Sequence, residues 1–207
     1  MRPPPIPISR LLAVVCLLLG LVVSPQVCGQ NVAFASDVVL RSVGLPWGDE
    51  VLFECPSDWP IALIIAEGSR YPVPTVEMKP DRDSLVLVSI TPYAALGERL
   101  SDDEIRSTVY GFGTRWLPRA VESEIILHEL SGKYGSGYYF SITDSAPNPD
   151  DPDDYEFLNQ GLADIGYAVI LFSILSDIKE SEGIDQAFEA LRSIQYVNRK
   201  DVKSIET

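Results

Sequence analysis

The order of the apolar segments constrains the fold of this 207-residue chain more than any other feature. Short β-rich runs recur from Val38 onward, and only two stretches show helical periodicity. The two helical patterns do not alternate one for one with the strands, as they would in a parallel sheet. We therefore expect an α+β domain with a largely antiparallel sheet covered by helices.

The expected strands are bounded by Gly, Pro, Asp or Ser residues, as strands usually are. They cover residues 38–40, 51–55, 61–66, 85–90, 124–130, 138–143, 155–162 and 167–175. A turn at 133–137 joins two of them into a hairpin, and residues 144–154 form a connecting loop rich in Pro and Asp. An amphipathic stretch at 184–196 predicts a helix near the C-terminus.

The other helical pattern starts at a capping box. The Ser101 hydroxyl can accept a hydrogen bond from the Glu104 backbone N–H, and the Glu104 carboxylate can accept one from the Ser101 N–H. Apolar side chains follow at three- and four-residue steps as Ile105, Val109, Phe112 and Trp116. Gly111 and Gly113 weaken this pattern and Pro118 ends it, so we expect a helix with one buried stripe.

Residues 1–29 have the arrangement of a secretory signal peptide. A basic start with Arg2 and Arg10 precedes an unbroken apolar run at 11–23. That run is shorter than the roughly 20 residues that span a bilayer, and no later segment is long enough. We therefore expect a periplasmic or secreted protein with no membrane span.

The position of the cleavage site has two solutions. Small residues favour a cut before Gln30, and Ala35 closes a second match that lies farther from the apolar run. Cys28 raises the alternative of a lipoprotein, although the residues before it fit that signal poorly. The expected organisation is a signal peptide at 1–29, a single domain at 30–200 and a polar tail at 201–207.

The mature chain is strongly acidic. Removal of the signal leaves 178 residues with 14 basic and 30 acidic side chains, a net charge of −16. Such a surface repels phosphate backbones and anionic membranes, which argues against binding to nucleic acid or lipid headgroups. Cys55 is then the only cysteine, so no disulfide can form within the mature chain, and we expect its side chain to be buried.

Two groups of motifs indicate a family. Val51–Trp59 is a strand that leads into Pro-x-x-Trp, and residues 137–144, 160–161 and 169–175 indicate paired strands before a final helix. Both groups resemble the PsbP-like superfamily. It includes the extrinsic photosystem II protein P, a nuclear transport factor that binds Ran, and exported bacterial proteins. The resemblance implies a helix–sheet–helix sandwich that acts by binding partners, and it carries over no catalytic residue.

His128 is the only histidine, so it would have to be the base of any hydrolytic triad. It lies in an expected strand, and the Gly-Ser-Gly at 135–137 lacks the spacing of a nucleophile elbow. One His and one Cys are also too few for the usual zinc site. We expect an ordinary strand histidine, with a periplasmic hydrolase that uses His128 or a carboxylate pair as the alternative.

The densest acidic cluster lies in the loop after Asn148. Its carboxylates belong to Asp150, Asp151, Asp153 and Asp154. Closely spaced oxygen ligands can hold calcium, but the loop has prolines in place of the mid-loop glycine of an EF-hand. A solvated connecting loop is the main expectation, and a weak, structural calcium site is the alternative. No other cofactor is expected.

Aromatic side chains offer a further candidate, a platform for a sugar or a peptide. They are Trp47, Trp59, Trp116, Tyr138 and Tyr139. Trp59 and Trp116 are expected in the core, and Tyr138 and Tyr139 must point to opposite faces of a strand. Because the sequence contains no complete catalytic set, we expect an exported, non-catalytic binding or accessory protein whose partner is a protein.

Overall fold

Two antiparallel sheets and two α-helices form the part of the chain that the structure describes, which confirms an α+β fold with antiparallel pairing. This computed structural model describes residues 37–65, 74–79, 86–94, 99–148 and 154–198. The chain divides into two units, Met1–Ala33 and Phe34–Thr207, and every described residue belongs to the second. The expected signal peptide and polar tail lie outside the described residues.

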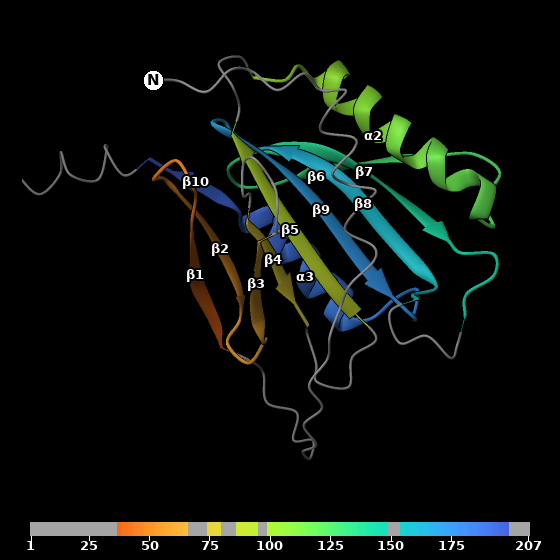
Figure 1. Cartoon of the computed structure of the whole chain (residues 1–207), viewed down its shortest axis with the longest axis horizontal. Helices are drawn as coiled ribbons and strands as arrows, with labels where there is room; N and C mark the ends of the chain where they lie inside the picture. Colours follow the sequence, from red (N-terminus) through yellow and green to blue (C-terminus); the bar gives the residue numbers. More distant parts are fainter. Residues whose placement is uncertain (1–36, 66–73, 80–85, 95–98, 149–153, 199–207) are drawn as a thin grey trace, which may run out of the picture. The chain divides into compact units, whose positions relative to one another are not determined.

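The larger sheet has seven strands in the order β3-β4-β5-β9-β8-β7-β6 (Figure 1). The strands are β3 (Ile61–Ile65), β4 (Pro74–Met78), β5 (Val86–Ala94), β6 (Leu127–Ser131), β7 (Ser136–Thr143), β8 (Phe157–Asp164) and β9 (Ala168–Ser176). Strands β5 and β9 have nine residues each and pair along their whole length, which places these β-rich segments at the centre of the sheet.

A second sheet was not predicted. It has three antiparallel strands in the order β1-β2-β10, which are β1 (Val38–Gly44), β2 (Glu50–Pro56) and β10 (Gln195–Val197). The sequence predicts a helix through Tyr196, but the backbone leaves the helical conformation at Ile194, where ψ is 127°. Residues 195–197 then pair with β2, because a strand partner far away in sequence overrides the local helical pattern.

Two helices accompany the sheets, α2 (Asp102–Trp116) and α3 (Glu182–Ser193), and the short 3-10 helix η1 (Leu117–Arg119) follows α2. The predicted capping box starts α2: the Glu104 N–H donates to the Ser101 hydroxyl at 3.3 Å, and the Ser101 N–H donates to the Glu104 carboxylate at 2.8 Å. The N-cap of α3 is the Ser181 hydroxyl, which accepts from the Ile184 N–H.

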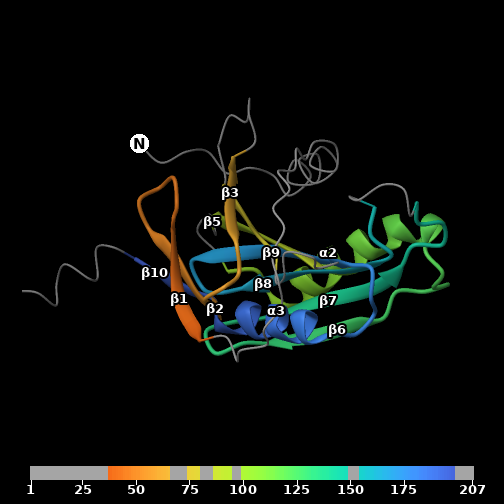
Figure 2. The ribbon, with the colours of Figure 1, turned by 90° about the horizontal axis from the view of Figure 1, so that it is seen from below.

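Neighbouring residues of β7 show that the two helices lie on opposite faces of the larger sheet. The Tyr138 hydroxyl donates to Asp102 of α2, whereas the Tyr139 ring packs on Phe188 of α3, with centroids 4.8 Å apart. Successive side chains of a strand point to opposite faces, as predicted for this pair. Figures 1 and 2 show α2 over strands β6–β8 and α3 on the other side of the sheet.

The main core lies between α3, the smaller sheet and one face of the larger sheet. Its largest buried members include Phe53, Trp59, Met78, Phe172 and Leu191. The prediction that Trp59 packs in the core is confirmed, because only 3% of its surface is exposed, whereas Trp116, predicted with it, is only partly buried at the end of α2. Cys55 is also buried, and desolvation raises the pKa of its thiol, so it packs as a small apolar side chain.

The sequence prediction missed one strand and misplaced the ends of several others. Strand β4 was missed, because Pro74 and Glu77 interrupt the β-rich pattern of this five-residue segment. Strand β5 continues through Pro92, where a break was expected. Among the described residues, β5 beyond Ile90 pairs with β9 and not with β4, so Pro92 lies where no described β4 residue needs its missing N–H.

The expected strand at 124–130 begins later, at Leu127. Upstream of this point, Val121 and Glu122 bond the end of β7. The Val121 N–H donates to the Thr143 carbonyl at 2.9 Å, and the Glu122 carboxylate accepts from the Thr143 N–H at 2.8 Å and from the Thr143 hydroxyl at 2.9 Å. Ile125 turns inward and packs against Gly113 of α2. Residues 124–126 therefore line α2 and do not extend β6.

Candidate functional site

A groove of about 550 Å³ runs between α2 and the segment that leads into β6. We call it the α2–β6 groove. It is lined by Asp103, Arg106, Ser107, Tyr110, Glu124, Ile125, Ile126 and Leu127. It is an open surface groove on the α2 side of the larger sheet, and β6 is the end strand of that sheet.

Helical periodicity builds one wall of the groove. Its α2 residues are Asp103, Arg106, Ser107 and Tyr110, at steps of three and four, so they share one face of the helix. The apolar stripe of Ile105, Val109 and Phe112 lies on a different face and is buried against the sheet. The capping box fixes where α2 begins, and it therefore fixes where this polar face starts.

The other wall combines one buried and one exposed isoleucine. Ile125 is 9% exposed and anchors the segment to α2, whereas Ile126 is 62% exposed. Tyr110 on the opposite wall is 50% exposed. Large apolar side chains thus reach solvent from both walls of the same groove, which is the kind of surface that marks an interaction site.

Charge is mixed within the groove. Asp103 and Glu124 supply carboxylates, and the Arg106 guanidinium lies 5.8 Å from the centroid of the Tyr138 ring. The hydrogen bond that Tyr138 donates to Asp102, at 2.8 Å, raises the pKa of the Tyr138 hydroxyl. The same hydrogen bond ties α2 to β7.

His128 lies on the exposed edge strand β6, as the sequence predicts. Its ring stacks on Tyr139 with centroids 5.1 Å apart. Within the described stretches it makes no hydrogen bond to a serine or to a carboxylate. The contacts of His128 therefore supply neither the nucleophile nor the orienting acid of a hydrolytic triad.

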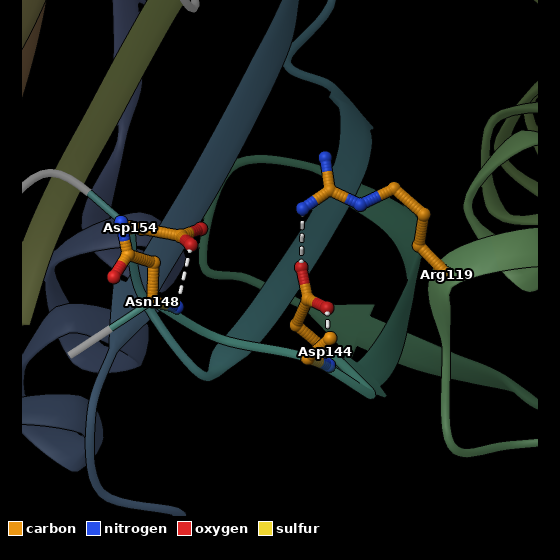
Figure 3. Close-up of polar contacts among 5 residues, drawn as sticks. Arg119, Asp144, Asn148 and Asp154 are labelled. Atoms are coloured by element: carbon orange, nitrogen blue, oxygen red, sulfur yellow. Dashed lines mark hydrogen bonds and ion pairs between the residues drawn. The ribbon is translucent and has the colours of Figure 1, made fainter. Parts of the chain in front are cut away.

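The predicted calcium loop is described only at its ends. Asp150, Asp151 and Asp153 lie outside the described residues, and Asp154 is described. One carboxylate oxygen of Asp154 accepts from the Asn148 N–H at 2.8 Å (Figure 3). In the described part of the chain, no three His, Cys, Asp or Glu residues cluster closely enough to hold a metal. The calcium site stays a prediction.

The segment before this loop is tied down by ion pairing. The Arg119 guanidinium donates to Asp144 at 2.8 Å, and the other Asp144 oxygen accepts from the Ala146 N–H (Figure 3). Ala120 forms an isolated bridge with Asp144. These contacts join the end of η1 to the end of β7, so Asp144 has a structural role at the start of the loop.

The predicted aromatic platform does not form as one surface. Trp59 is buried, and Tyr138 and Tyr139 lie on opposite faces of the sheet. Trp47 is 38% exposed and has a different neighbour, Tyr196, a residue that was not singled out in the sequence. No local pattern links these two residues, because they come from distant segments.

The residues of the α2–β6 groove were also missed. A polar stripe at positions 103, 106, 107 and 110 is visible in the sequence, but it has the ordinary pattern of a solvated helix face. Only the approach of residues 124–127 turns that face into a groove.

No described helix is long and apolar enough to cross a membrane. Comparison of the chain with protein-family models, with curated proteins and with solved structures found no match.

Proposed function

We propose that this chain is an exported, non-catalytic binding protein that holds a segment of a protein partner in the α2–β6 groove. One observation carries the proposal: Tyr110 and Ile126, which are 50% and 62% exposed, line the two walls of one groove. Aromatic and aliphatic side chains that stay exposed on facing walls gain free energy when a partner covers them.

The charges of the groove indicate the kind of segment. Asp103 and Glu124 flank the apolar surface, and the whole chain carries a net charge of −14. A partner segment with basic side chains beside its apolar ones would be attracted to this surface. Because β6 is the end strand of the described sheet, an extended segment can also pair with its outer backbone edge, as in other cases of strand addition.

The proposed architecture is the helix–sheet–helix sandwich of the PsbP-like superfamily. The placement of α2 and α3 on opposite faces of the larger sheet supports it. Burial of Trp59 directly after β2 supports it as well, because this residue ends the Pro-x-x-Trp motif. The three-stranded second sheet makes the chain more sheet-dominated than a simple sandwich.

Export is the second part of the proposal, and it rests on the signal pattern of residues 1–29. Cell fractionation with N-terminal sequencing tests it. A mature chain that begins at Gln30 in the periplasmic or extracellular fraction is expected. A full-length chain in the cytoplasm would contradict export, and a lipid-modified Cys28 would replace the soluble form with an anchored one.

Site-specific photocrosslinking tests the groove. A photoreactive phenylalanine analogue placed at Tyr110 or at Ile126, in the cells that make the protein, should crosslink the same protein partner from both positions. The control position is Tyr134, which is 39% exposed on the β6–β7 turn and is not part of the groove. Equal labelling from Tyr134, or none from the groove, would overturn the proposal.

A charge-reversal variant adds a second arm. Glu124→Lys should weaken the crosslink from position 110, while Asp185→Lys makes the same charge change on α3, outside the groove. Glu124 and Asp185 are both exposed, so both variants should fold. If both variants weaken the crosslink equally, only the net charge matters and the groove is not the site.

A further inference from the structure

A second cluster lies where three segments meet at one end of the two sheets. We call it the aromatic tip, and it consists of Trp47, Asp49, Tyr167 and Tyr196. Trp47 and Asp49 belong to the β1–β2 loop, Tyr167 to the β8–β9 turn and Tyr196 to β10 (Figure 1). The aromatic tip shares no residue with the α2–β6 groove and does not rest on the function proposed for it.

Two tight turns carry the exposed rings of Trp47 and Tyr167. In the β8–β9 turn, the Ile165 N–H donates to the Ala168 carbonyl, and Gly166 has a φ of +95°. Glycine at the first central position of a two-residue hairpin is the mark of a type II′ turn, which fixes the residue that follows, Tyr167. In the β1–β2 loop, Gly48 has a φ of +97°, and its N–H donates to the Leu45 carbonyl. The two turns therefore fix the backbone positions from which Tyr167 and Trp47 project.

Polar contacts join the β1–β2 loop to β10, and a ring contact adds the β8–β9 turn. The side chain of Trp47 hydrogen-bonds to the Tyr196 hydroxyl, and that hydroxyl donates to Oδ2 of Asp49. The Tyr196 and Tyr167 rings are in contact, with centroids 5.5 Å apart and a tilt of 37°. Among the described residues, no other side chain pairs with the Asp49 carboxylate, so its second oxygen can accept from a ligand.

The exposed surface of the tip combines ring faces with a negative charge. Tyr167 is 69% exposed and Trp47 is 38% exposed. Ring faces attract cations, most strongly those of tryptophan and tyrosine. A carboxylate beside them favours a cation that also donates hydrogen bonds. Arg99 lies beside the β8–β9 turn: its Nη2 atom is 3.0 Å from the position that a Cβ on Gly166 would take, and its Nε atom is 3.8 Å from Oδ2 of Asp164.

We propose that the aromatic tip binds an arginine side chain of a protein partner. The planar guanidinium stacks on the exposed ring of Tyr167 or Trp47 and donates to the free oxygen of Asp49. Guanidinium fits both halves of this surface, because it stacks on aromatic rings and is less strongly hydrated than an ammonium group. The acidity of the whole chain adds long-range attraction.

The test is an NMR titration of the full mature chain with three capped tripeptides, Gly-Arg-Gly, Gly-Lys-Gly and Gly-citrulline-Gly. Citrulline keeps the shape of arginine without its charge. The arginine peptide should shift the Trp47 indole N–H and the Tyr167 amide in a saturable way, the lysine peptide should do so more weakly, and the citrulline peptide should leave them in place.

Matched variants separate a site from general attraction. Asp49→Asn should weaken binding of the arginine peptide by about two- to fivefold, the range of an exposed ion pair. Tyr167→Ser should weaken it by a similar factor. The control Asp185→Asn removes the same charge from α3 and should leave the affinity unchanged.

Three results would overturn the proposal. The first is equal shifts with the arginine and citrulline peptides, and the second is equal weakening by Asp49→Asn and Asp185→Asn. The third is a response of the tip to an N-acetylglucosamine oligomer and not to the arginine peptide, which would assign the rings to carbohydrate. None of these outcomes bears on the α2–β6 groove, which the crosslinks from Tyr110 and Ile126 test separately.

Discussion

The side chain of Ile125 packs directly on Gly113 of α2. A Cβ atom at position 113 would lie only 2.8 Å from Cγ2 of Ile125 and 2.9 Å from its Cγ1 and Cδ1 atoms. The absence of a side chain at this helical position is what lets the segment before β6 approach α2. This contact sets the width of the α2–β6 groove, because Ile125 is one of its lining residues.

Gly113→Ala should therefore destabilise the protein although alanine favours helix formation. The new Cβ overpacks the contact with Ile125, which costs about 1–3 kcal/mol, and this exceeds the gain of roughly 0.8–1 kcal/mol from helix propensity. Urea unfolding measures the difference.

The matched control is Gly111→Ala in the same helix. No atom lies within 4 Å of a Cβ at this position, so only the propensity term operates and the protein should gain about 0.5–1 kcal/mol. Equal stabilisation by both substitutions would show that Ile125 yields easily and that the contact does not set the groove.

Edge strand β3 should promote association of the protein when it is heated. Leu63 of β3 is 55% exposed, whereas Val76, which lies opposite it on β4, is 2% exposed. The apolar surface that solvent reaches at this edge therefore belongs to β3. An exposed apolar edge strand without charged residues is a template for pairing with another chain. Leu63→Lys should reduce light scattering on heating and change the free energy of unfolding by less than about 0.5 kcal/mol.

The partner position provides the contrast. Val76→Lys places an unpaired charge in the core and should cost several kcal/mol, on the order of the 3–5 kcal/mol seen for uncompensated buried charges. If Leu63→Lys destabilises the protein to a similar extent, Leu63 is packed and does not form a free edge.

Tyr196 should make stability depend on pH in the alkaline range. Burial, followed by the hydrogen bond to Asp49, raises the pKa of Tyr196 from 10.0 to about 12. The folded chain therefore holds this proton more tightly than the unfolded chain. The resulting stability is complete below about pH 10 and is lost as the pH rises through about 12.

The comparison of wild type with Tyr196→Phe isolates this residue. Between about pH 10 and 12 the wild type should lose more stability in urea unfolding than Tyr196→Phe, because Tyr93 and Tyr138, whose pKa values are also raised, are present in both chains. Parallel curves would show that the Tyr196 proton is not held by the fold.

Calcium should stabilise the chain weakly if the loop at Asp150–Asp154 binds it. At ten times its dissociation constant, a ligand adds about 1.4 kcal/mol, which raises the melting temperature of a domain of this size by about 3–6 °C. A melting curve with calcium, compared with one in a chelator, measures the shift.

The double variant Asp151→Asn and Asp153→Asn should abolish that shift, while Asp185→Asn should keep it. The same melting temperature with calcium and with chelator in the wild type would assign the loop to a solvated connection. Asp154 would then serve only to accept from the Asn148 N–H.

Elements with local causes could be read from the sequence. The capping box sets the start of α2 because Ser101 and Glu104 are only three residues apart and satisfy each other's backbone. The opposite orientations of Tyr138 and Tyr139 follow from the pleat of a single strand. No knowledge of the rest of the chain is needed for either.

Elements with distant causes could not be read in this way. Strand β10 forms only because β2 offers an edge, and its local sequence continues a helical pattern. Strand β4 is equally dependent on its neighbours β3 and β5, since Pro74 and Glu77 give it little strand character of its own. In both cases pairing partners outweigh local propensity.

The candidate sites follow the same division. The sequence by itself determined the polar stripe on α2, the acidity of the chain and the composition of its loops. The tertiary structure alone decided that Ile125 approaches Gly113 to form a groove, and that Asp49 meets Tyr196 across 147 residues of chain. A site assembled from segments so far apart has no local sequence pattern, because packing of the sheets, and not spacing along the chain, brings its residues together.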